Sequence, residues 1–211
     1  MKLFGGLNIT WPKTILFALV AGIITGLVAS IPAIENTSLH DIAVSYEWWL
    51  IFAFVIASNS EKSWESALKT FLFFLISQPF CFLTEIALGH LTMDMALYYY
   101  GSIWGPATVL TLPGGFIAYF IQKQNILGCI ILGLGNTIQI LMGVAYIGPL
   151  VQNPPFHLIT ILVCFASVIV MTLSIQKSRK NQIITFLIAI LVSAGLIALV
   201  LANGRTIFFG A

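Results

Sequence analysis

Residues 71–90 read FLFFLISQPFCFLTEIALGH, an almost unbroken apolar run with an amide, a proline and a carboxylate in it. The apolar segment 66–88 that contains most of it is long enough, as a helix, to cross a hydrocarbon core about 30 Å thick. It lacks the alternation of polar and apolar residues that a membrane β-barrel strand requires. The stretch therefore predicts a membrane-spanning helix whose polar residues need an explanation of their own.

The composition of the whole chain agrees with this prediction. Of its 211 residues, 59% are hydrophobic and 8% are charged, and the mean hydropathy is +1.03. Soluble domains carry about 25% charged residues, so a water-soluble fold of this size is close to excluded. Backbone groups in lipid must be paired within a helix or a closed barrel, and the sequence therefore predicts an all-α polytopic bundle.

Seven apolar segments are candidate spans of one transmembrane domain, residues 1–211. The second is the weakest, because its apolar core WWLIFAFVIA is short and Glu47 lies near its start. The connections between segments are brief, so none of them can hold a separate soluble domain. The predicted spans are 14–34, 42–59, 66–88, 97–121, 126–148, 156–175 and 183–203.

The basic residues predict the orientation, because cytoplasmic loops carry an excess of Lys and Arg. With seven spans and a cytoplasmic N-terminus, only Arg205 falls outside. Without the second span, the four basic residues from Lys123 to Lys180 would also lie outside. We therefore expect a multi-pass protein of the cytoplasmic membrane with its C-terminus outside. The residues placed inside are Lys2, Lys13, Lys62, Lys69, Lys123, Lys177, Arg179 and Lys180.

A polar stripe follows the third predicted span. At 100° per residue, four of its side chains share one side, and Gln78 and Glu85 flank them. Such a stripe is expected to face the bundle interior rather than lipid. Pro79 removes a backbone donor in the middle of the span, which predicts a bend that is either passive or part of a gate. The stripe consists of Thr70, Ser77, Cys81 and Thr84.

The fifth span places Gln139, with Asn136 at its edge, on a face otherwise rich in glycine. Small residues allow close helix approach, and side-chain amides can hydrogen-bond across to a neighbour. This face is therefore either a tight helix contact, for example with Gln78, or a polar lining for a substrate. Gln78, Glu85, Asn136 and Gln139 are the candidate substrate-binding residues.

Pro106, Pro113, Gly114 and Gly115 lie inside the fourth predicted span. Two prolines and a glycine pair predict a broken or strongly bent helix. Discontinuous helices expose half-helix ends, which suit ion sites in transporters. These four residues and Pro79 are therefore the candidate positions for a helix break or for gating.

The first span carries small residues at a spacing of four, namely Ala18, Gly22, Gly26 and Ser30. We call these four residues the small-residue ridge. Such a ridge lets a second helix pack closely against it. That helix belongs either to this chain or to a partner membrane subunit.

Acidic residues and all three histidines collect on the predicted outer side, with Glu47, His90 and Asp94 as outer-face candidates. The simpler interpretation is a solvated rim, and the alternative is a mouth that handles cations, protons or a metal. No metal, nucleotide or hydrolase motif appears, and the three cysteines match no metal pattern. We therefore predict no metal site, no catalytic residue and no nucleic-acid partner, and the sequence names no cofactor; membrane lipids are the expected surroundings.

These features favour a small-solute or ion translocator, or the substrate-binding subunit of one. One alternative is a membrane-embedded enzyme acting on lipid at the outer leaflet, which requires Glu85, His90 and Asp94 to converge. Another is a non-catalytic accessory subunit that uses the small-residue ridge. In size and in its first helix the chain resembles the substrate-binding membrane subunits of energy-coupling-factor vitamin transporters. That resemblance concerns architecture and implies no site residue.

Overall fold

The computed structural model describes residues 3–35, 37–44, 46–152 and 157–202, and within these ranges it is helical without any strand. Six helical segments are long and apolar enough to cross a membrane. The predicted helical membrane bundle is confirmed at this level, and the chain is a multi-pass integral membrane protein. The six segments are Trp11–Ala29, Ser63–Ala87, Met93–Gln122, Ile126–Gln152, Leu158–Ile175 and Arg179–Ala202.

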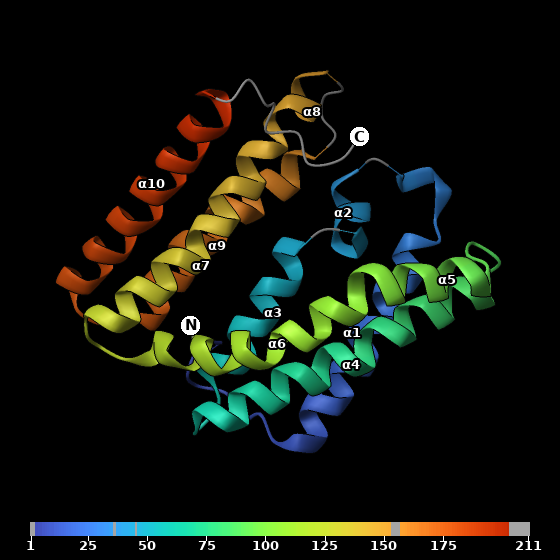
Figure 1. Ribbon diagram of the computed structural model, residues 1–211, viewed down its shortest axis with the longest axis horizontal. Coiled ribbons are helices and arrows are strands. Elements are labelled where there is room, and N and C mark those ends of the chain that lie inside the picture. Colours follow the sequence, from blue (N-terminus) through green and yellow to red (C-terminus); the bar gives the residue numbers. More distant parts are fainter. Residues whose placement is uncertain (1–2, 36, 45, 153–156, 203–211) are drawn as a thin grey trace.

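The order of elements, labelled in Figure 1, is as follows. They are α1 (Trp11–Ala29), η1 (Pro32–Ile34), α2 (Ser38–Val44), α3 (Tyr46–Ser58), α4 (Ser63–Ala87), α5 (Met93–Tyr99), η2 (Tyr100–Trp104), α6 (Gly105–Ala118), η3 (Tyr119–Gln122), α7 (Ile126–Ala145), α8 (Ile147–Gln152), α9 (Leu158–Ile175) and α10 (Arg179–Ala202). Segments η1 and η3 are 3₁₀-helices, and η2 is a π-helical turn.

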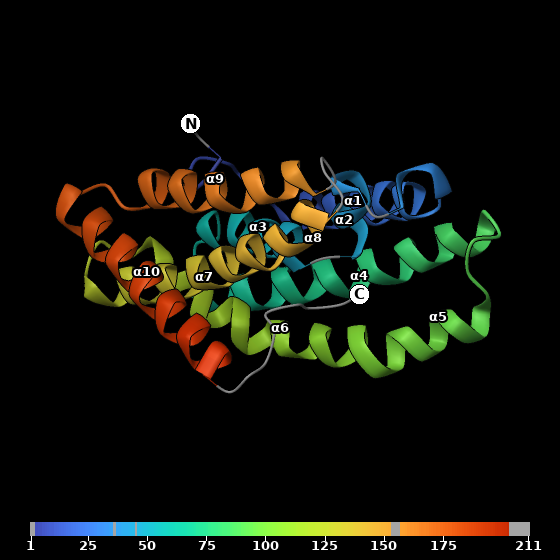
Figure 2. The same cartoon turned by 90° about the horizontal axis from the view of Figure 1, so that it is seen from above.

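The long helices form two groups that diverge from one end of the molecule (Figure 1). In one group α4 packs between α1 and α6, and in the other α7 packs between α9 and α10, as Figure 2 shows. The short helix α3 lies between the groups and contacts α4 and α6 on one side and α7 and α9 on the other. Helix α2 also joins the groups, because it contacts α1 and α9.

The small-residue ridge is the contact between α1 and α4. A Cβ atom added to Gly22 would lie 2.4 Å from the Ser77 backbone oxygen, and one added to Gly26 would lie 2.5 Å from that of Cys81. Only glycine therefore allows the two backbones to approach this closely. A partner subunit at the ridge stays a prediction, and it would have to displace α4.

The fourth predicted span passes its prolines without leaving the helical path. Pro106 lies in the first turn of α6, where a missing backbone donor is tolerated, and the π-helical turn η2 directly precedes that helix. Pro113 lies inside α6, and Pro79 likewise lies inside the single helix α4. The predicted complete break in the fourth span is therefore wrong, and η2 is its only trace within residues 93–122.

The interruption lies instead in the second predicted span, which is divided between α2 and α3. The 13 residues of α3 cover about 20 Å, less than the roughly 30 Å of a hydrocarbon core. Neighbouring helices surround α3, so that large side chains such as Trp49 and Ile56 are buried on it. A single long second helix is therefore not formed.

The connections that carry the basic residues meet at one end of the bundle. Gln122 donates to the Ala57 carbonyl, and Gln176 donates to the Ile121 carbonyl. These bonds join the C-terminal ends of α3, η3 and α9, and we call this region the basic end. All described Lys and Arg residues lie in or next to it: Lys13, Lys62, Lys69, Lys123, Lys177, Arg179 and Lys180. Lys2 and Arg205 lie outside the described residues.

Candidate functional site

Asp41 of α2 is buried against the start of α9, and the side chain is held by two residues far away in the sequence. Its Oδ2 atom lies 2.8 Å from Nδ1 of His157 and accepts a hydrogen bond from the Thr160 hydroxyl. An ionised carboxylate only accepts, so His157 Nδ1 is the donor. The residue is 3% exposed, which makes Asp41 part of the interior rather than of a solvated rim.

His157 has a backbone conformation that non-glycine residues seldom adopt. Its φ of 67° is the only positive value for a non-glycine residue in the described part of the chain. The Tyr146 ring stacks on the imidazole with a centroid distance of 5.0 Å. The aromatic stack and the Asp41 contact therefore stabilise a strained residue at the N-terminus of α9.

Glu47 lies in the first turn of α3, on the other side of the interruption from Asp41, and is fully buried. A helix N-terminus favours a negative side chain, which lowers the cost of burying this carboxyl group. Gln139 of α7 donates from Nε2 to the Glu47 backbone oxygen at 2.9 Å. The two ends of the interrupted crossing thus each carry one buried acid.

Cys164 connects the two acids in space. It lies within electrostatic range of both Glu47 and Asp41, and it follows Thr160 by one turn of α9. Its Cβ lies 3.1 Å from the position that a Cβ on Gly143 would occupy, so α7 and α9 approach closely here. We call the group formed by Asp41, Glu47, Gln139, His157 and Thr160 the acid site.

Asn136 lies three residues before Gln139 on α7 and is also fully buried. It donates from Nδ2 to the Thr172 hydroxyl oxygen at 2.9 Å. Within the described residues, neither the Asn136 Oδ1 atom nor the Gln139 Oε1 atom has a hydrogen-bond partner. The structure thus brings two of the four predicted substrate-binding residues together next to Glu47.

The other two predicted substrate-binding residues lie on α4, in the other group of helices. Gln78 is 2% exposed, and its Nε2 atom has no hydrogen-bond partner among the described residues. Glu85 is half-buried and accepts a hydrogen bond from Cys81 Sγ at 3.3 Å. The suggested contact between Gln78 and the amides of α7 is not formed, since those amides donate to Thr172 and Glu47.

The outer-face candidates do not form one cluster. Glu47 is in the interior, whereas His90 and Asp94 are exposed near the C-terminal end of α4 and the start of α5. No side-chain hydrogen bond joins Glu85, His90 and Asp94 in the described ranges. The structure therefore does not provide the convergence that a lipid-directed enzyme at these residues requires.

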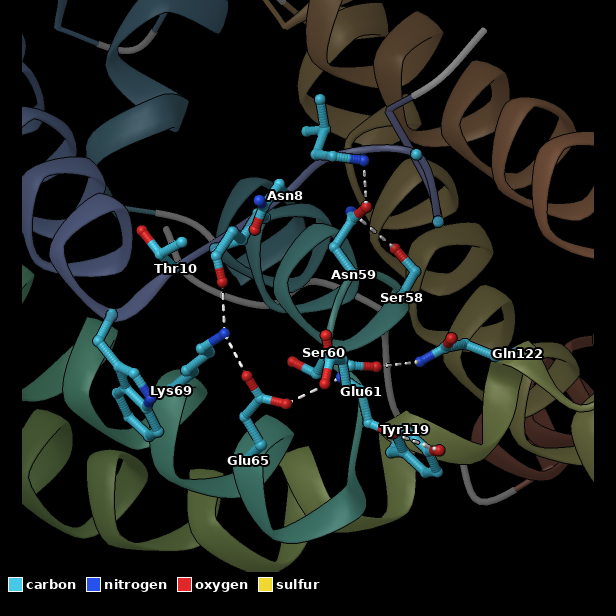
Figure 3. A pocket seen from close by; sticks show the side chains of 15 residues that line it. Asn8, Thr10, Ser58, Asn59, Ser60, Glu61, Glu65, Lys69, Tyr119 and Gln122 are labelled. Carbon is cyan, nitrogen blue, oxygen red and sulfur yellow. Dashed lines mark hydrogen bonds and ion pairs between the residues drawn. The ribbon is translucent and has the colours of Figure 1, made fainter.

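A polar pocket of about 720 Å³ lies at the basic end, where the N-terminal segment crosses the ends of α3 and α4 (Figure 3). Lys69, which is 3% exposed, donates to the Ile9 carbonyl and to the Glu65 carboxylate, and lies 5.4 Å from the centre of the Trp11 ring. The other wall includes Asn59, which follows α3. Helix α3 therefore has the acid site at its first turn and this pocket at its last.

The acid site was only partly accessible to sequence reasoning. Asp41 and His157 had been grouped with other outer polar residues, and Thr160 had not been singled out. The available signal was an acid at each end of an apolar segment too short to span a membrane. No family model matches the chain, and neither a curated protein nor a solved structure shows significant similarity to it.

Proposed function

We propose that this chain is a small-solute or ion translocator, or the binding subunit of one, and that a proton or cation occupies the acid site. The observation that carries the proposal is the burial of Asp41 and Glu47 on either side of an interrupted crossing. Ionisable residues at membrane depth are costly, and they mark ion pathways and proton relays. Interrupted helices supply the binding sites of many transporters.

In this proposal α2 and α3 together make a seventh crossing of the cytoplasmic membrane. The basic end faces the cytoplasm, as the excess of Lys and Arg there supports, and the acid site lies nearer the outer side. The N-terminus is then inside and the C-terminus outside.

The proposed route follows α3 from the acid site to the pocket at the basic end. At the outer side His157, held between Asp41 and Tyr146, borders the acid site. At the inner side the polar pocket offers hydrated space next to Asn59 and Glu61. The prolines of α6 have no part in this route, whereas Gln78 and Glu85 lie on a helix that contacts α3 and stay secondary candidates.

The test uses the purified chain in sealed liposomes with imposed gradients of H⁺, Na⁺ or K⁺. We expect the wild-type chain to collapse at least one gradient faster than protein-free vesicles do. Asp41→Asn and Glu47→Gln should each slow that flux about tenfold or more. The matched control, Asp94→Asn, removes an exposed acid and should leave the flux unchanged. Wild-type vesicles as tight as protein-free ones to all three cations would overturn the proposal.

A further inference from the structure

Two amide oxygens beside Glu47 specify the chemistry of the acid site more closely. We propose that Glu47, Gln139 and Asn136 bind one dehydrated alkali-metal cation through the Glu47 carboxylate, the Gln139 Oε1 atom and the Asn136 Oδ1 atom. This inference rests on the proposed function, whose cation and binding residues it names.

The orientation of the Gln139 amide is fixed by its bond to α3. Its partner is the backbone carbonyl oxygen of Glu47, at 2.9 Å. A carbonyl can only accept, so the group that faces it must be the NH₂ group. Oε1 is therefore the atom that is left, and it is buried with no donor among the described residues.

Asn136 repeats this arrangement one turn earlier. Residues three apart lie on the same side of a helix, so its side chain and that of Gln139 are neighbours along α7. Its NH₂ group donates to the Thr172 hydroxyl at 2.9 Å, and its Oδ1 atom has no partner in the described ranges. Buried acceptors are nearly always paired in native proteins, and a bound cation supplies the missing partner for both oxygens.

The charge of the set selects a monovalent cation. The direct ligands are one carboxylate and two neutral amide oxygens, so a single positive charge balances them. The second acid of the acid site, Asp41, faces the His157 imidazole and the Thr160 hydroxyl. Calcium and magnesium sites usually draw on several carboxylates, and transition metals prefer imidazole and thiolate ligands. The described residues contain no group of three His, Cys, Asp or Glu side chains that could hold such a metal.

The experiment measures thermal unfolding of the full chain in detergent at constant ionic strength, with LiCl, NaCl, KCl or choline chloride. We expect one alkali cation to raise Tm saturably over choline, by about 5 °C or more at a hundred times its Kd. Glu47→Gln keeps the shape of the side chain but removes its charge, and should abolish that rise. Gln78→Met is the matched control, because the buried amide it removes has an unpaired nitrogen, which cannot bind a cation.

The outcomes separate this inference from the proposed function. If no alkali cation raises the wild-type Tm, the cation site is disproved whether or not the variants fold. If protons still cross the vesicle membrane in that case, the proposed function stands without it. If a cation stabilises the wild-type chain through Glu47 but no gradient collapses in liposomes, the cation site stands and the translocator fails. An equal rise in wild-type and Glu47→Gln protein would place the cation elsewhere and overturn the inference.

Discussion

The crossing formed by α2 and α3 and the one formed by α5, η2 and α6 treat their backbones in opposite ways. The first is interrupted and lies between four other helices, whereas the second is one continuous helical run with most of its surface exposed. A free backbone group in lipid costs several kcal/mol, and it is tolerated only where protein or a water-filled cavity surrounds it. The interruption therefore lies in the crossing that protein encloses, although the prolines lie in the other.

The ends of α3 show how the enclosed crossing satisfies its backbone. Asn59 Nδ2 donates to the Val55 carbonyl at 2.7 Å, and Gln122 Nε2 donates to the Ala57 carbonyl at the same distance. The Ser60 hydroxyl donates to the Ile56 carbonyl at 2.8 Å. A half-length helix can thus end inside the bundle because neighbouring side chains supply the donors that its own chain lacks.

The largest expected effect concerns the packing of α3. Trp49→Ala should destabilise the fold by about 3–5 kcal/mol, because its ring is 2% exposed and contacts Phe73, Phe74 and Trp104. Unfolding of the purified protein in mixed micelles with increasing denaturing detergent measures the change. The matched variant on the exposed side of α6, Val109→Ala, should change stability by less than about 0.5 kcal/mol. Equal losses would remove the distinction between an enclosed and an exposed crossing.

The next effect concerns the cap of α3. Gln122→Ala removes donors to the Ala57 and Ser60 carbonyls and should cost about 1–3 kcal/mol in the same unfolding assay. Ser102→Ala on η2 is the comparison, because its hydroxyl only adds a bond to the Tyr98 carbonyl within its own helical run. We expect that variant to be nearly neutral. If it proved the more costly of the two, capping would not be what stabilises the end of α3.

A smaller net change is expected at His157. His157→Gly relieves the strain of a positive φ, worth about 1 kcal/mol, but loses the contacts with Asp41 and Tyr146. Since a hydrogen bond to a charged group contributes about 1.5–3 kcal/mol, the balance should be a modest loss of stability. The flux in liposomes should fall more than the stability does. A stabilised variant with full flux would show that the histidine contributes nothing to the acid site.

The smallest effect is expected for the exposed proline of α6. Pro113→Ala restores a helical donor, so stability should stay the same or rise by about 1 kcal/mol, and the liposome flux should be unchanged. Parallel melting and flux measurements test both expectations. Loss of flux with intact stability would assign gating to α6 after all and reverse the comparison between the two crossings.

The membrane helices were predictable because length and hydropathy decide them locally. The burial of Asn136 and Gln139 was also predictable, since polar side chains in an apolar helix avoid lipid. The pairing of Asp41 with His157 was not, because it joins residues 116 positions apart through the packing of α2 on α9. The fourth span misled for a related reason, as a proline only permits a break, and the surroundings of the helix decide whether one forms.

The position of α3 also has a consequence for biosynthesis. Every helix that encloses it, from α4 to α9, is synthesised after it, so α3 leaves the ribosome before any of its neighbours exist. Its apolar stretch is too short to remain in lipid by itself, and it carries a carboxyl group at its first turn. The second crossing therefore reaches its final depth only once residues up to Ile175 have been inserted, and a chain that stops before α9 leaves Glu47 without its shelter.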